Sequence, residues 1–132
     1  MLRRAAAMTL VLAGLSSPAF ATEWVNCADR EGAASFDLLL GATEVISVAG
    51  MTITVGEQVW ASDVAYGPGD PVVVGQAFET PDMIIVDAVD PGVTTRIAEL
   101  RLFKASEGDA FAYGGTLRVP GHGAWAVSCS GP

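Results

Sequence analysis

Short apolar runs separated by Gly, Pro and Asp make up most of this chain. Within residues 51–55, three apolar side chains alternate with two threonines, which is typical of a strand with one buried face. Similar runs occupy residues 34–40, 45–48, 58–61, 72–78, 83–89, 97–103, 111–119 and 124–129. After residue 21 no sustained apolar stripe has helical spacing. The pattern predicts an all-β fold, a small antiparallel β-barrel or β-sandwich of about seven to nine short strands.

Three segments in this pattern need a separate interpretation. Residues 97–103 consist of good helix formers, but Glu and Arg alternate there with apolar residues, which favours a strand. The pair Gly114–Gly115 lies inside a predicted strand and suggests a β-bulge. Residues 63–71 contain two prolines and two glycines, so we expect a loop there.

The first 21 residues have the order of a secretory signal peptide. Arg3 and Arg4 precede an apolar run over residues 5–15, and the sequence Ala-Phe-Ala at residues 19–21 fits a cleavage site after Ala21. The apolar run is much shorter than the ~20 residues of a membrane span. We therefore expect a periplasmic or secreted protein whose mature chain, residues 22–132, is a single β domain without membrane insertion.

Two cysteines lie near the ends of that domain. An even number of cysteines in an exported protein favours a disulfide, here between Cys27 and Cys129. The alternative, a metal-binding or reactive pair, lacks a Cys-x-x-Cys spacing and has only one histidine to draw on, His122. The predicted bond places the first and last strands side by side.

Charge limits the possible partners. The 132 residues include 7 Lys and Arg against 15 Asp and Glu, a net charge of −8. Without Arg3 and Arg4 the remaining 5 basic residues give a net charge of −10. Such a chain is not expected to bind nucleic acid, because it has no basic surface for phosphates. An acidic surface instead favours a basic envelope or extracellular protein as partner.

The chain offers little material for catalysis, and we do not expect an enzyme or a cofactor. His122 lies between two glycines, a setting typical of a turn rather than of a positioned base. No Gly-x-Ser-x-Gly motif accompanies it.

Acidic residues are dense between positions 63 and 90. The pattern favours a solvated acidic face and no metal site, although calcium binding by this cluster is left open. Asp87 differs from the others because it interrupts an apolar strand, so its charge needs a partner, for which Arg96 and Arg101 are the nearest candidates. The members of the cluster are Asp63, Asp70, Glu79, Asp82, Asp87 and Asp90.

The aromatic residues suggest one candidate binding loop. Trp24 and Trp125 flank the predicted disulfide and are expected to pack in the core beside it. Trp60 and Tyr66 lie next to the Pro/Gly loop and are expected to be exposed. The predicted partner-binding loop comprises Trp60, Asp63, Tyr66 and Asp70.

Three functional hypotheses follow. The first is a small exported acidic β-sheet binding module. The second is an inhibitor of a basic cell-wall hydrolase: in size, export and terminal cysteines the chain resembles bacterial lysozyme inhibitors. The Ser-Gly-x-x-Tyr motif of that group is absent, since Ser-Gly occurs only at residues 130–131, and Lys104 is the sole lysine. The third is a self-assembling envelope protein in which an open edge strand such as residues 83–89 pairs with another chain.

Overall fold

The computed structural model describes residues 22–41 and 43–131, so the predicted signal peptide lies outside the described residues. Ten strands form one sheet, which confirms the all-β prediction. A single turn of 3-10 helix, η1 (Val64–Tyr66), precedes β5. The strands are β1 (Glu23–Ala28), β2 (Ala34–Leu40), β3 (Val48–Val55), β4 (Gln58–Ala61), β5 (Asp70–Pro71), β6 (Val73–Thr80), β7 (Met83–Val89), β8 (Arg96–Glu107), β9 (Ala110–Val119) and β10 (Gly123–Ser130).

The sequence pattern gives most of these strands but misses some boundaries. Residues 97–103 lie in strand β8, as their alternation predicts. The two-residue strand β5 forms inside the segment expected to be a loop. Gly50 does not separate two strands; it lies within β3, where the ladder to β2 shifts register between Leu39 and Leu40. No helix in the described part of the chain is long and apolar enough to cross a membrane.

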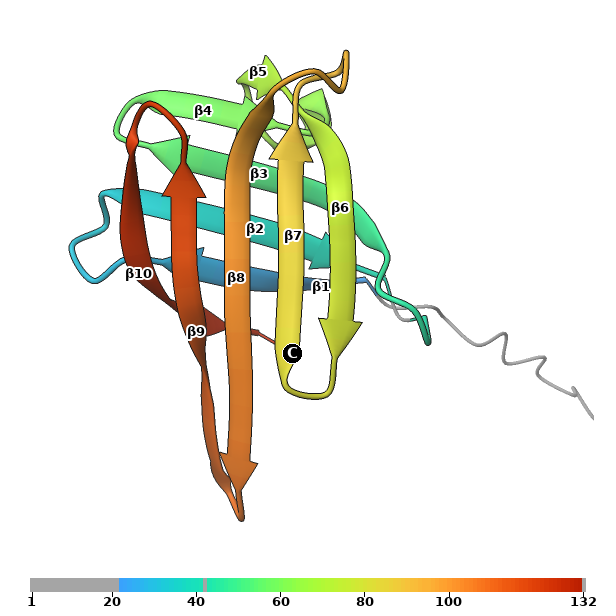
Figure 1. Ribbon diagram of the computed structural model, residues 1–132, viewed down its shortest axis with the longest axis vertical. Helices are drawn as coiled ribbons and strands as arrows, with labels where there is room; N and C mark the ends of the chain where they lie inside the picture. Colours follow the sequence, from blue (N-terminus) through green and yellow to red (C-terminus); the bar gives the residue numbers. More distant parts are fainter. Residues whose placement is uncertain (1–21, 42, 132) are drawn as a thin grey trace, which may run out of the picture.

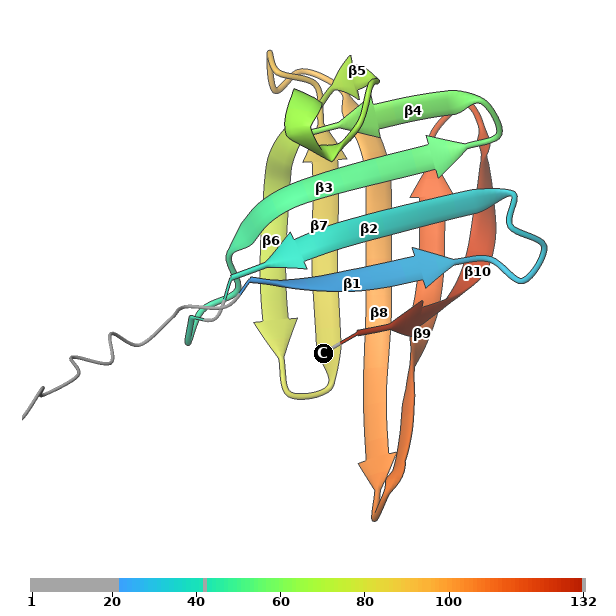
Figure 2. The same cartoon turned by 180° about the vertical axis from the view of Figure 1, so that it is seen from behind.

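The sheet curls into a nearly closed barrel. Its strand order is β5-β4-β3-β2-β1-β10-β9-β8-β7-β6, and all neighbours are antiparallel except β4 and β5. Strands β1–β4 cross behind β6–β9 at a steep angle (Figure 1), and the reverse view shows β1–β3 in front (Figure 2). Strand β7 lies between β6 and β8, so the expectation of an open edge at residues 83–89 is wrong. The free edges belong to β5 and β6.

Alternate residues of the strands face the interior and form the core. Val25 and Cys27 of β1 are fully buried, while Trp24 and Asn26 between them are exposed. Other large, fully buried side chains are Phe36, Leu38, Met51, Ile53, Ile84, Leu100, Leu102 and Leu117.

Gly115 has a packing role rather than the predicted bulge. The β8–β9 ladder continues without a shift through Leu102↔Gly115 and Phe103↔Gly114. A Cβ atom on Gly115 would lie 1.8 Å from the carbonyl oxygen of Arg101, so only glycine permits this close approach of the two backbones.

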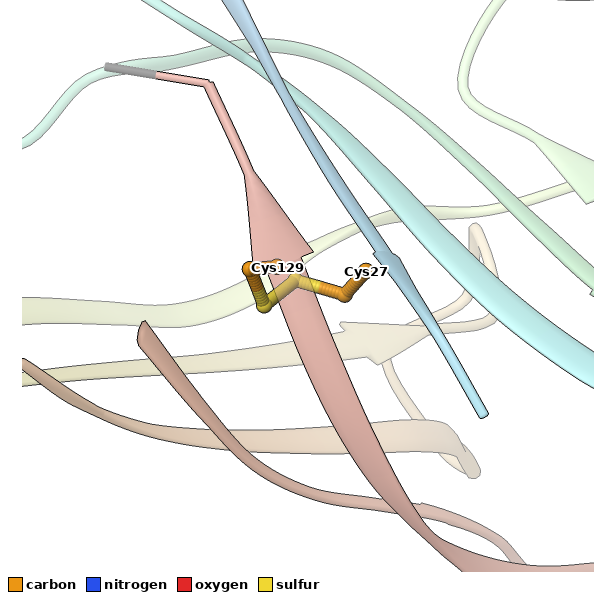
Figure 3. The surroundings of a disulfide bond; sticks show 2 residues. All are labelled: Cys27 and Cys129. Atoms are coloured by element: carbon orange, nitrogen blue, oxygen red, sulfur yellow. A yellow bond between two sulfur atoms is a disulfide. The ribbon is translucent and has the colours of Figure 1, made fainter. Parts of the chain in front are cut away.

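The disulfide joins the two halves of the sheet (Figure 3). Cys27 and Cys129 are bonded and lie directly opposite each other in the β1–β10 ladder, with Cα atoms 4.1 Å apart. Strands β1–β5 and β6–β10 meet only through this ladder, which has three residue pairs. The bond confirms the predicted pairing and is compatible with an oxidising, exported location.

Candidate functional site

A shallow pocket opens on the outer face of β1–β3, beneath η1. It has a volume of about 510 Å³, and its main side chains are Trp24, Asn26, Asp37, Thr52 and Tyr66. Asp37 pairs with Asn26 on one side and with Thr52 on the other, so these three residues form one row across the strands. Their chain neighbours point into the core, which turns this row outward. We call this site the Asp37 pocket.

The helical turn η1 holds Tyr66 over the sheet. Asp63 caps this turn, because its Oδ1 accepts a hydrogen bond from the Ala65 amide at 2.8 Å. The Thr52 hydroxyl donates to the Tyr66 carbonyl oxygen at 2.9 Å. Gly50 lies under the aromatic ring, and a Cβ atom there would come within 2.6 Å of it. The absence of a side chain at Gly50 therefore lets the Tyr66 ring lie against the strand.

Two aromatic rings form one wall of the pocket. The rings of Trp24 and Tyr66 pack edge to face, with centroids 5.6 Å apart and planes at 76°. Trp24 is 37% exposed, so it is available to a ligand. Such rings attract cations through the negative potential of their faces.

Asp37 supplies the charge of the pocket. Burial raises the pKa of its carboxyl group above the ordinary value, because a charged carboxylate is less well solvated there. Within residues 22–41 and 43–131, no Lys, Arg or His side chain forms an ion pair or hydrogen bond with Asp37. The pocket thus contains a half-buried carboxylate without a cation of its own.

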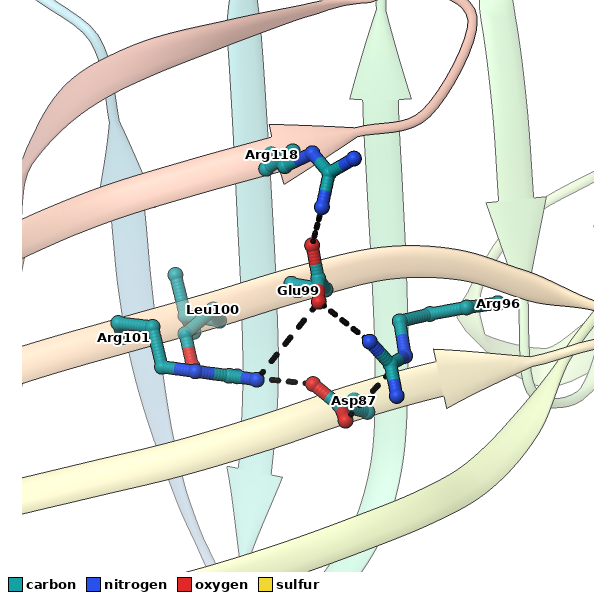
Figure 4. A network of polar contacts seen from close by, with 6 residues as sticks. All are labelled: Asp87, Arg96, Glu99, Leu100, Arg101 and Arg118. Atoms are coloured by element: carbon teal, nitrogen blue, oxygen red, sulfur yellow. Dashed lines mark hydrogen bonds and ion pairs between the residues drawn. The ribbon is translucent and has the colours of Figure 1, made fainter.

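Asp87 shows how the same fold treats a paired carboxylate (Figure 4). It is 3% exposed and accepts a hydrogen bond from Arg101 Nη1 at 2.8 Å, while Arg96 Nε lies 3.6 Å away. Its cross-strand neighbour Glu99 accepts hydrogen bonds from Arg96 at 2.7 Å and Arg118 at 2.8 Å. Burial alone would raise the pKa of Glu99, but these bonds and charges lower it. The predicted ion pairing of Asp87 with Arg96 and Arg101 is confirmed.

Only one residue of the predicted binding loop belongs to the pocket. Tyr66 lies in it, whereas Asp63 and Asp70 hold the loop itself; Asp70 accepts a hydrogen bond from Gln58 Nε2 at 2.9 Å. Trp60 was expected to be exposed but is 7% exposed and packs edge to face on His122 at 5.1 Å. Its place opposite the inward-facing Ile53 in β3 explains this.

The prediction for Trp24 is also wrong, and for a related reason. The two inward positions at the end of β1 are taken by Val25 and Cys27, so Trp24 faces outward. Trp125 does pack against the core, as predicted. Sequence reasoning missed Trp24, Asn26, Asp37 and Thr52 as pocket residues. One signal was available: once the disulfide fixes Cys27 inward, alternation turns Trp24 and Asn26 outward.

The acidic residues between positions 63 and 90 do not converge. Asp90 closes its own turn, where hydrogen bonds from Thr95 and Thr94 lower the pKa of its carboxyl group. Glu79 lies 3.9 Å from Lys104 Nζ. In the described ranges, no group of three or more His, Cys, Asp and Glu side chains is arranged to hold a metal ion. His122 lies in the turn between β9 and β10, where its backbone amide donates to the Val119 carbonyl.

Comparison of the chain with models of protein families, with curated proteins and with solved structures finds no match.

Proposed function

We propose that the chain is a small exported acidic binding module, which anchors a cationic group of a basic partner in the Asp37 pocket. The observation that carries this proposal is the half-buried Asp37 carboxylate, which has two aromatic rings beside it and no cationic partner among the described residues. Asp87 has its arginines within the fold, whereas Asp37 needs a cation from outside.

An arginine side chain has the chemistry that fits this pocket best. Its guanidinium group donates to a carboxylate through several N–H groups and also stacks on aromatic rings. A cation would offset the unfavourable desolvation of Asp37, and the amide of Asn26 and hydroxyl of Thr52 line the same pocket as further polar groups. The net charge of −10 for residues 22–132 would draw a basic partner toward this surface.

Binding without covalent chemistry agrees with the state of the reactive side chains. The described cysteines are joined in the disulfide, and the ring of His122 packs against Trp60. Neither lies in the pocket. We therefore infer that the chain is not an enzyme.

The proposal is tested by titrating the mature, disulfide-bonded protein with N-acetylarginine amide, followed by calorimetry. We expect saturable binding that Asp37→Asn weakens by about tenfold or more, which corresponds to about 1.4 kcal/mol. Asp109→Asn removes the same charge at the exposed β8–β9 turn and should leave the affinity unchanged. Equal weakening by both variants would show that only the overall charge matters and would overturn the pocket.

A basic cell-wall hydrolase is one partner that this chemistry would suit. If the chain inhibits such an enzyme through the Asp37 pocket, an excess of the protein slows lysis of a bacterial suspension by lysozyme, and Asp37→Asn restores it. Undiminished lysis would exclude lysozyme as the partner while leaving arginine binding to be judged by calorimetry.

A further inference from the structure

Strand β6 forms a free edge of the sheet. Among the described residues it pairs only with β7, so its other side presents unpaired backbone N–H and C=O groups at alternate residues. A register shift between Val74 and Gln76 interrupts the ladder at Gly75. The regular part of the edge therefore begins at Gln76 and ends at Thr80, where β6 ends.

A groove runs beside this regular part. It has a volume of about 420 Å³ and lies between residues 44–46 and residues 77–81. Its apolar side chains include Val45, which is 76% exposed, and Phe78, which is 48% exposed. Glu44 and Glu79 add negative charge, of which the Glu79 share is partly offset by Lys104 at 3.9 Å.

We propose that this edge and groove, the β6 seam, bind an extended segment of a partner polypeptide with alternating apolar and basic side chains. The free backbone groups would pair with the segment as an added strand, and such pairing is a common mode of peptide recognition. The apolar side chains of the segment would cover Val45 and Phe78, and its basic ones would face Glu44 and Glu79.

The charges favour such a partner over a second copy of this chain. Strand β6 contains Glu79 and no basic residue, so pairing of two β6 edges would bring like charges together. Each copy would also bring a net charge of −10. The β6 seam shares no lining residue with the Asp37 pocket, so this inference does not rest on arginine binding there.

The test uses synthetic peptides of about seven residues, long enough to span the free edge. One alternates Lys and Val, a second replaces every Lys by Glu, and a third has Pro in place of the central Val. Amide hydrogen exchange of the full mature protein is followed by NMR. We expect the Lys–Val peptide to slow exchange at alternate amides of residues 76–80, and the Glu and Pro peptides to have no such effect.

Two matched variants locate the contact. Phe78→Ser should weaken binding of the Lys–Val peptide by about fivefold or more, because an exposed apolar contact is lost. Phe103→Ser removes a phenylalanine that is 62% exposed on β8, away from the seam, and should leave binding unchanged. Asp37→Asn should also leave it unchanged, which separates this result from the test of the Asp37 pocket.

Three results would overturn the proposal. The first is the absence of protection in β6 at saturating or millimolar Lys–Val peptide. The second is equal weakening by Phe78→Ser and Phe103→Ser, in variants shown to be folded by thermal denaturation. The third is protection of β6 without any peptide, together with a dimer mass in sedimentation, which would make a second copy the occupant.

Discussion

At the scale of single residues, the hydroxyl group of Tyr113 differs most from an ordinary environment. It is buried and has no hydrogen-bond partner among the described residues. Its ring packs near Phe111, with centroids 5.8 Å apart. Burial, together with the nearby charge of Glu79, raises the pKa of Tyr113 to about 12. A buried polar group without a partner destabilises the folded state.

Replacement of that hydroxyl should therefore increase stability. We expect Tyr113→Phe, which keeps the aromatic ring, to raise the free energy of unfolding by about 1 kcal/mol, measured by urea denaturation. Tyr113→Leu, which also removes the ring, should lower it. A clear loss of stability in Tyr113→Phe would mean that the hydroxyl has a partner in solution.

The same residue gives a pH dependence with a defined sign. Tyr113 has a pKa of about 12 in the folded state, against 10.0 for an ordinary tyrosine. Between these values the unfolded chain loses the proton more readily, so stability should fall as the pH rises from 10 toward 12. The fall should be smaller in Tyr113→Phe. An equal fall in both proteins, by thermal denaturation, would contradict the cause given.

Asp37 should show the opposite relation between charge and stability. Since burial raises the pKa of Asp37 above 3.8, its ionised form is unfavourable in the folded state. Asp37→Asn should raise the melting temperature at neutral pH, by less than about 1 kcal/mol because half of the group faces solvent. The difference should vanish as the pH falls below 3.8, where both states of the wild-type protein are protonated. A destabilised Asp37→Asn at neutral pH would indicate a hidden partner for the carboxylate.

At the scale of elements, alternation along the chain predicts most strands but not which face points inward. The alternation over residues 51–55 is confirmed in β3. Trp24 and Trp60 lie in predicted strands too, yet their burial is the reverse of what we expected. Both faces of a short strand can carry apolar residues, so only a fixed inward position decides the face. Cys27 fixes it in β1, and no such residue fixes it in β4.

The arginines around Asp87 should contribute unequally to the β7–β8 pair. Arg101→Met removes the 2.8 Å hydrogen bond to a nearly buried carboxylate, and we expect it to cost about 2–4 kcal/mol. Arg96→Met removes a longer contact of 3.6 Å from a side chain that is 53% exposed, and should cost less than about 1 kcal/mol. Urea denaturation of both variants measures the difference. Equal losses would mean that Arg96 alone can hold Asp87.

At the scale of the whole molecule, the disulfide lies where the two halves of the sheet meet. The sequence predicts this contact between the first and last strands, because the cysteines bracket the domain. The strand order and the position of the open edge could not be predicted, because they depend on contacts between distant strands. For the same reason the Asp37 pocket was missed: residues 24, 37, 52 and 66 converge only through the β1–β3 ladders and η1.

Removal of the disulfide should loosen this joint first. The bond closes a loop with a sequence separation of 102, so Cys27→Ala with Cys129→Ala should cost up to about 4–5 kcal/mol in the chain-entropy model. We also expect faster hydrogen exchange in β1 and β10 than in β7 and β8, because only three residue pairs join β1 to β10. Unchanged stability in the double variant would contradict this role.

The location of cation binding tests the central claim most directly. Two-dimensional ¹H–¹⁵N NMR of the mature, disulfide-bonded protein, titrated with N-acetylarginine amide, reports every backbone amide and the three tryptophan indoles. We predict saturable shifts at the Trp24 indole and at the amides of Asp37, Thr52 and Tyr66, and none of these in Asp37→Asn. Shifts spread over the acidic surface, or confined to residues outside the Asp37 pocket, would contradict the account.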